Sequence, residues 1–290
     1  MVRRLSFVLA LLLVVALFSF GAPPFGGPSS ERGNTKAVLS VEARSLPEAP
    51  YQRAPDLRQV WDSAITRDHS PELVTHGRTG TSGGRIALTF DDGPDRQTTP
   101  LILDVLRRHH LKATFFVIGR QIKKNPGLLR RIVKEGHTIG NHTYDHADLS
   151  DLSPKRMRLE LQSTQKAVDD ALGYNYPMQL MRPPYGNPYI GGSDALPVFR
   201  KVVREEELFP VMWTLDPRDY LFGGHPEGVV RGVVRADKPG REAERDQVLL
   251  LHDTNRQTVQ ALPRIIHYYE RSGRRFADVG ELLADKYTNP

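Results

Sequence analysis

Cysteine is absent from the 290 residues of this chain. Its absence excludes a disulfide framework, a thiolate metal site and a cysteine nucleophile, and it leaves no attachment point for a lipoprotein anchor. Any bound metal ion must therefore be held by histidine and carboxylate side chains.

Two further absences narrow the fold and the partner classes. No glycine-rich phosphate loop follows the first buried strand, which disfavours an open doubly wound nucleotide-binding sheet. The net charge is +6, but the basic residues are scattered rather than gathered in a stripe. We therefore expect a weak electrostatic preference for an anionic partner such as a cell wall, and no nucleic-acid partner.

The N-terminus has the pattern of an export signal. Two arginines precede an apolar run from Leu5 to Phe20, which is shorter than the ~20 residues of a comfortable membrane span. Small residues stand where a signal peptidase would cut before Ala22. We expect residues 1–21 to be a signal peptide or, as the alternative, an uncleaved N-terminal membrane anchor. Both place the remaining chain outside the cytoplasmic membrane, as a secreted, periplasmic or envelope-associated protein.

The chain then changes composition twice. Residues 22–50 are rich in proline, glycine and serine without periodicity, which predicts a disordered linker. In residues 51–84, apolar side chains at helical spacing predict a short helix that packs on the main domain: Leu57, Val60, Trp61 and Ile65. The main domain is expected to span residues 85–290.

One stretch organises the main domain. Residues 86–90 are apolar, aromatic or β-branched and predict a buried strand. The strand ends at Asp91 and Asp92, because the following glycine and proline force a turn. Neighbouring carboxylates repel each other, so we expect a metal ion, an arginine or both beside them.

Strands and helices alternate after this point. The predicted strands are 86–90, 113–118, 137–141, 179–182, 210–214, 248–251 and 276–279. The predicted helices between them are 101–110, 128–133, 154–172, 198–206 and 262–269, with part of a last helix at 282–285. About seven such units predict an α/β fold, a parallel (β/α) barrel that is regular or distorted.

Polar clusters follow five of these strands at their carboxyl ends, where barrel enzymes build their sites. These clusters are Asp91-Asp92, His142-Thr143-Tyr144-Asp145-His146, Arg182-Pro183-Pro184-Tyr185, Asp216-Pro217-Arg218-Asp219-Tyr220 and His252-Asp253. Together with Thr89-Phe90 and Gly93-Pro94, they resemble the five motifs of the polysaccharide deacetylase family, also called NodB-homology domains or family 4 carbohydrate esterases. The resemblance runs from about residue 85 to 285, and it departs at Tyr220, where the family pattern usually has tryptophan.

The resemblance implies a distorted (β/α)7-8 barrel, one divalent metal ion, most often Zn2+, and removal of acetyl groups from N-acetylated sugars. It implies that Asp92, His142 and His146 hold the metal. Asp91 would be the general base oriented by Arg182, and His252 the general acid held protonated by Asp219. The substrate and oxyanion residues would be the backbone N–H of Tyr185, the side chain of Leu250 bordering the acetyl pocket, and Tyr220 in the wall behind Asp219.

The expected function is an exported, metal-dependent N-deacetylase of an N-acetylhexosamine polysaccharide such as peptidoglycan or a chitin-like glycan. An O-acetyl esterase acting on xylan-type glycan would use the same metal and base. A catalytically silent glycan-binding protein is a third interpretation, which the filled base, acid and ligand positions disfavour. Five other histidines are expected to be solvated or structural: His109, His110, His137, His225 and His267.

Export can be tested by N-terminal sequencing of the mature protein. The charged start and the apolar run predict recovery outside the cytoplasm, with a new N-terminus at or near Ala22 if the signal is cleaved. An intact Met1 in the membrane fraction would favour the anchor. Recovery from the cytosol alone would contradict both versions.

Overall fold

The computed structural model describes residues 57, 60–61, 84–191, 194–237 and 245–288. The predicted signal segment and linker, and Ile65 of the predicted extension helix, lie outside the described residues. Among the residues that are described, no helix combines the length and apolar character needed to cross a membrane.

Six parallel strands form one sheet in the order β5-β4-β3-β2-β1-β6. Their bounds are β1 Ile86–Asp91, β2 Thr114–Val117, β3 Thr138–Asn141, β4 Leu180–Met181, β5 Phe209–Pro210 and β6 Gln247–His252. Register pairs Asp91 with Phe116 on one side and with His252 on the other. All the carboxyl ends therefore meet at one edge of the sheet.

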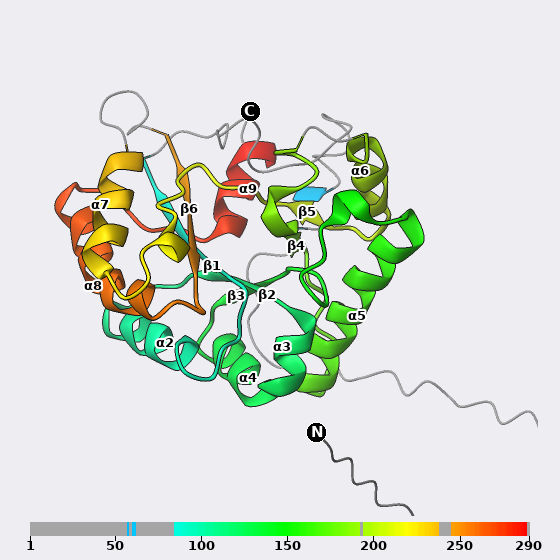
Figure 1. Ribbon diagram of the computed structural model, residues 1–290, viewed down its shortest axis with the longest axis horizontal. Helices are drawn as coiled ribbons and strands as arrows, with labels where there is room; N and C mark the ends of the chain where they lie inside the picture. The colour runs from blue at the N-terminus through cyan, green and yellow to red at the C-terminus, as the bar shows by residue number, and fades with distance from the viewer. Residues whose placement is uncertain (1–56, 58–59, 62–83, 192–193, 238–244, 289–290) are drawn as a thin grey trace, which may run out of the picture. The chain divides into compact units, whose positions relative to one another are not determined.

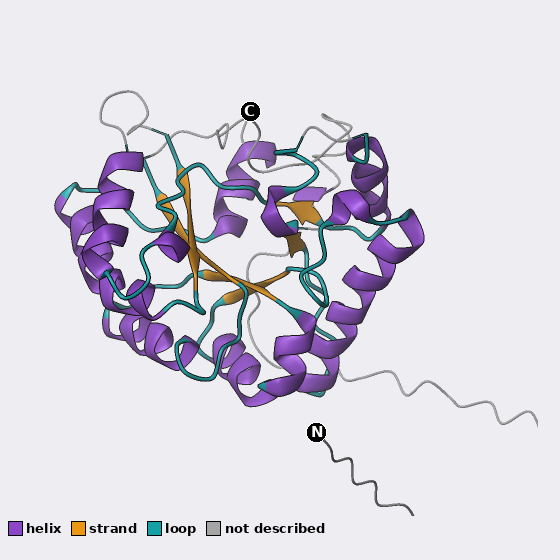
Figure 2. Ribbon diagram, in the orientation of Figure 1, coloured by secondary structure: helices purple, strands orange, loops and turns teal. Residues whose placement is uncertain are grey.

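Helices flank the strands, as Figure 2 shows. Their bounds are α2 Thr99–Arg108, α3 Gly119–Lys124, α4 Pro126–Lys134, α5 Pro154–Leu172, α6 Leu196–Glu205, α7 Pro226–Ala236, α8 Arg256–Arg271 and α9 Val279–Thr288 (Figure 1). Three single 3-10 turns lie between them: η1 Leu149–Asp151, η2 Pro184–Gly186 and η3 Asp219–Leu221. The longest of the described helices, α5, begins where the Ser153 side chain accepts a hydrogen bond from the N–H of Arg156, and it ends at left-handed Gly173.

The side-chain alternation of the central strands separates two cores. On β1, Ile86, Leu88 and Phe90 pack with the outer helices, whereas Ala87 packs on the inner face. Because successive side chains of a strand point to opposite faces, Thr89 and Asp91 face inward with Ala87. The sheet thus presents Asp91 to its concave side.

The structure confirms the predicted α/β class, as a curled parallel sheet with helices outside it. It differs in four elements, two predicted strands and two further helices. Predicted strand 276–279 is a single bridge from Ile86 to Phe276, because the Asp278 side chain accepts a hydrogen bond from the N–H of Gly280 at the start of α9. Of the predicted strand 210–214, only the first residue belongs to β5. The carbonyl oxygens of Val211 and Met212 accept hydrogen bonds from the Arg182 side chain and are not free to continue the strand. Helices α3 and α7 were not predicted from the sequence.

The described part of the extension packs into the inner core. Leu57, Val60 and Trp61 are all buried beside Phe209 and Tyr287. The Trp61 ring meets the Phe209 ring edge to face at 4.8 Å, and the N–H of Leu57 donates to Gln179 Oε1 at 3.2 Å. These contacts lie on the inner face, away from the outer helices.

Substitution of this tryptophan tests the packing. Trp61→Ala should lower the free energy of unfolding by about 3 kcal/mol, because it removes a buried aromatic ring and leaves a cavity. Urea unfolding followed by circular dichroism measures the change. Leu159→Ala is the control, since Leu159 is 48% exposed on α5 and its loss should change the free energy by under about 0.5 kcal/mol. Equal stability of Trp61→Ala and wild type would contradict the packing.

Candidate active site

A pocket of about 400 Å³ opens at the carboxyl ends of the strands. Its walls come from the loops after five strands, and its lining includes every cluster predicted from the sequence. The lining residues are Asp91, Asp92, His142, His146, Pro183, Tyr185, Trp213, Asp216, Tyr220, Leu250, His252, Thr254 and Asn255.

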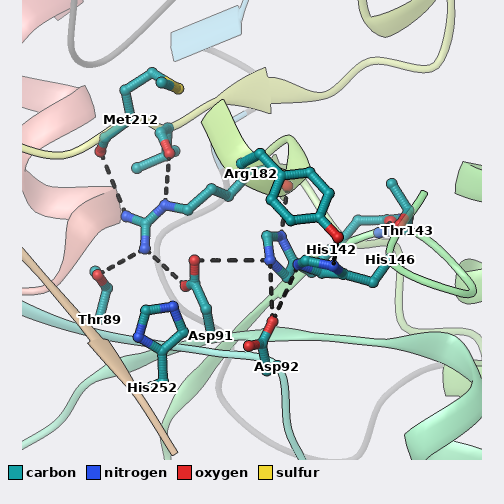
Figure 3. Close-up of polar contacts among 12 residues, drawn as sticks. Thr89, Asp91, Asp92, His142, Thr143, His146, Arg182, Met212 and His252 are labelled. Carbon is teal, nitrogen blue, oxygen red and sulfur yellow. Dashed lines mark hydrogen bonds and ion pairs between the residues drawn. The ribbon is translucent and has the colours of Figure 1, made fainter. Parts of the chain in front are cut away.

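Three side chains in this pocket converge on one point. The ligand atoms of Asp92, His142 and His146 all lie within 4.8 Å of one another. Asp92 Oδ1 is 3.5 Å from Nε2 of His142 and 3.2 Å from Nε2 of His146 (Figure 3). A carboxylate and two imidazoles at this spacing are a donor set that suits zinc and related divalent ions.

The hydrogen bonds around the cluster also fit a cation. Nδ1 of His142 lies 2.7 Å from the carbonyl oxygen of Arg182, so Nδ1 carries a proton and Nε2 is the ring nitrogen left to bind a cation. Asp92 Oδ1 is buried and has no hydrogen-bond partner among the described residues. Burial opposes ionisation of Asp92, but the imidazoles of His142 and His146 outweigh it and hold the pKa of this carboxyl well below its usual range. An anionic oxygen facing two ring nitrogens is the environment that a metal ion completes.

The loops that carry these groups adopt an uncommon backbone. Four non-glycine residues in them have positive φ: Asp92 at 79°, Thr143 at 63°, His146 at 66° and Tyr185 at 60°. Such conformations cost of order 1–3 kcal/mol each and persist only where the surroundings enforce them. Their concentration around one pocket marks it as a functional site.

Asp91 is held by a buried arginine. Arg182 Nη1 donates to Asp91 Oδ1 at 2.7 Å and to Thr89 Oγ1 at 2.8 Å. Burial lowers the pKa of Arg182, and the Asp91 carboxylate opposes this shift. The second oxygen of Asp91 lies 3.7 Å from Nε2 of His142, so the carboxylate stands between the guanidinium and the imidazole (Figure 3).

His252 is held by a second buried carboxylate. Asp219 accepts a 2.6 Å hydrogen bond from His252 Nδ1 and a 2.8 Å bond from the His252 backbone N–H. Thr258 and Gln257 fix Asp219 in turn, through its side chain and its carbonyl oxygen. Burial alone would lower the pKa of His252, but Asp219, joined by the charges of Asp91 and Asp92, raises it to about 9.

The remaining predicted residues also line the pocket. Tyr185 is 61% exposed, and its hydroxyl lies 3.2 Å from Nδ1 of His146. Leu250 is buried on the inner face of β6. The Tyr220 ring meets the His252 ring edge to face at 5.6 Å and is 52% exposed. His137, by contrast, is a packed histidine whose pKa burial lowers to about 4.

One supporting residue, Glu160, was missed from the sequence, and Asp253 was named there without a role. The Glu160 carboxylate on α5 accepts the backbone N–H groups of Tyr144 and Asp145, which shapes the loop between the two cluster histidines. The Asp253 carboxyl packs against Gly93, where an added Cβ would lie 2.1 Å from Asp253 Oδ2. Glu160 gives no local signal in the sequence. Asp253 gives one, because it directly follows His252 at the end of an apolar strand.

The chain resembles known proteins in both sequence and structure. A family profile described as polysaccharide deacetylase matches residues 78–195. Peptidoglycan-N-acetylglucosamine deacetylase PgdA of Listeria monocytogenes is 34% identical over 256 residues, which are 87% of this chain and 50% of the relative. A peptidoglycan-N-acetylglucosamine deacetylase of Bacillus cereus is 40% identical over 207 residues, covering 70% of this chain and 89% of the relative.

Among solved structures, the wild-type CE4 family pseudoenzyme BA3943 of Bacillus anthracis matches with a TM-score of 0.59 and 28% identity, over 69% of this chain and 66% of that one. The present chain spans about half the length of the Listeria relative and most of the Bacillus cereus relative. The sequence similarity extends across the sheet and the pocket described above. This chain therefore belongs to the polysaccharide deacetylase family.

Proposed function

We propose that this protein is an exported, metal-dependent N-deacetylase that acts on N-acetylhexosamine residues of peptidoglycan or a chitin-like glycan. The observation that carries the proposal is one pocket in which a three-ligand cluster lies beside an arginine-paired carboxylate and a carboxylate-paired histidine. The names of the Listeria and Bacillus cereus relatives, both peptidoglycan-N-acetylglucosamine deacetylases, support the substrate class. In the reaction, water adds to the acetyl carbon, the C–N bond breaks, and acetate and an amine are released.

Asp92, His142 and His146 are proposed to hold the divalent ion, with Zn2+ favoured by the nitrogen and oxygen donors. Such an ion, when bound, would polarise the acetyl carbonyl and make a nearby water more acidic. Three protein ligands leave coordination positions open for substrate and water.

Asp91 is proposed as the general base. Its Oδ1 is occupied by Arg182, which fixes the orientation of the carboxylate. Its Oδ2 faces the cluster and is the atom that would take the proton of the attacking water. The backbone N–H of Tyr185 is proposed to stabilise the oxyanion, and Leu250 to border the acetyl methyl group.

His252 is proposed as the general acid. Its Nδ1–H donates a hydrogen bond to Asp219, so Nε2 is the atom that would protonate the departing amine. An amine leaves only with a proton, whereas the alkoxide of an O-acetyl ester leaves more easily. The buried Asp219–His252 pair therefore favours the amide substrate over the ester.

A pseudoenzyme on the same fold means that fold alone does not decide activity. Filled acid, base and cluster positions support an active enzyme here.

Metal content tests the cluster. Wild type purified with Zn2+ present should hold one ion per chain, and His142→Ala should lose most of it, because two remaining protein ligands bind weakly. Elemental analysis measures the ratio. His137→Ala is the control, since His137 is buried outside the pocket. Equal metal content in wild type and His142→Ala would overturn the assignment.

The pH profile tests the acid. Deacetylation should fall as the pH rises through the His252 pKa near 9, because the imidazole loses the proton that the amine needs. Asp219→Asn removes the main group that raises this pKa, so the alkaline limb should move to lower pH and the rate should drop about 100-fold. Steady-state rates across pH, with metal content checked in parallel, decide the point. An unmoved limb would exclude Asp219 as the partner.

Acetate release tests the function itself. Purified protein should release acetate from tetra-N-acetylchitotetraose and from peptidoglycan. The release of acetate from acetylated xylan should be much lower. Asp91→Asn should lower the rate by about 10²- to 10⁴-fold while leaving metal content intact. Release from xylan alone would favour the esterase, and no release from any substrate would favour the silent glycan-binding protein.

A further inference from the structure

Asp216 lines the pocket but has no role in the chemistry above. It is half-buried in the segment between β5 and β6. Its Oδ1 accepts a 2.7 Å hydrogen bond from the backbone N–H of Arg218, the Asx-turn arrangement that fixes a carboxylate against its own loop. Arg218 has φ 55°, so the turn holds a conformation that few side chains adopt.

The second oxygen of Asp216 has no hydrogen bond, and neither oxygen has an ion pair, within the described part of the chain. Burial raises the pKa of Asp216 and Asp219 adds to this, while the Arg218 N–H, His252 and the Arg218 charge oppose it. His252 already has Asp219 at 2.6 Å as its partner. Asp216 is therefore a fixed hydrogen-bond acceptor on the pocket wall, and His252 does not need it as a partner.

We propose that Asp216 is a specificity-determining residue, which accepts a hydrogen bond from a hydroxyl of the bound sugar and disfavours a sugar that carries a carboxylate there. The proposal rests on the deacetylase function above and narrows it to neutral N-acetylhexosamines. Peptidoglycan contains both kinds of sugar, because N-acetylmuramic acid differs from N-acetylglucosamine by an anionic lactyl ether in place of a hydroxyl. Asp216 thus selects N-acetylglucosamine within the alternating polymer.

Two physical effects produce this selection. A carboxylate only accepts hydrogen bonds, and a bond from a sugar hydroxyl to a charged acceptor is stronger than one between neutral groups. A second carboxylate brought to the same half-buried position would repel the first, with no arginine or lysine paired there to offset it. Replacing the hydroxyl by the lactyl group therefore loses an attraction and adds a repulsion.

Asp216→Asn tests the first effect, because asparagine keeps an oxygen for the Arg218 N–H but removes the charge. On tetra-N-acetylchitotetraose, kcat/KM should fall about 10- to 100-fold, mainly through a higher KM. The value of kcat, the metal content and the alkaline limb of the pH profile should match wild type. Asp170→Asn is the control, since Asp170 is an exposed carboxylate paired with Lys166 on α5 and should leave kcat/KM unchanged.

A tetrasaccharide of alternating N-acetylglucosamine and N-acetylmuramic acid tests the second effect. Mass spectrometry locates the lost acetyl groups, and the share lost from N-acetylmuramic acid should rise in Asp216→Asn relative to wild type. Asp216→Ser, which also keeps a turn acceptor, should behave in the same way. An unchanged kcat/KM, an unchanged share, or a shifted alkaline limb in both variants would overturn the proposal. Wild-type failure to release acetate would instead overturn the deacetylase function.

Discussion

A fully buried guanidinium must be surrounded by acceptors, because an unpaired charge in the interior is strongly destabilising. Arg182 meets this requirement with Asp91, Thr89 and the carbonyl oxygens of Val211 and Met212, while its Cζ atom lies 4.1 Å from the centre of the Phe116 ring. These partners come from β1, from β2 and from the segment after β5. One side chain therefore connects the inner ends of several strands, and the pocket is built around it.

Sheet register sets the spacing of the proposed base and acid. Asp91 and His252 are direct partners on neighbouring parallel strands. Adjacent strands lie about 4.8 Å apart, and this separation is set by backbone hydrogen bonds rather than by loops. Each of the two side chains is then oriented by its own buried partner, Arg182 or Asp219. The proposed proton acceptor and proton donor thus share one rigid frame, whereas the cluster histidines come from a loop supported by Glu160.

Much of this arrangement could be predicted from local sequence. The alternation of β1 fixes which face Asp91 takes, and α5 matches its predicted bounds because Ser153 and Gly173 mark its ends. One strand escaped prediction because of a contact between distant residues: β5 ends early because Arg182, from the segment after β4, donates to the next carbonyl oxygen, that of Val211. Segment 276–279 instead turns into α9 through a local hydrogen bond, from the N–H of Gly280 to the Asp278 side chain. The contact between Asp253 and Gly93 is likewise visible only once β6 lies beside β1.

Positions 93 and 253 constrain each other sterically. The space that a methyl group would take at Gly93 is filled by the Asp253 carboxyl, whose atoms would lie 2.1 to 2.5 Å from it. A larger residue at position 93 thus becomes tolerable only after position 253 has shrunk, and shrinking position 253 first leaves a void behind the Asp91-Asp92 turn. A single substitution at position 93 therefore produces a clash, and a single substitution to a smaller residue at position 253 leaves a void. Among related sequences, the two positions should therefore be inherited as one unit, and a lineage that has changed one should carry a compensating change at the other.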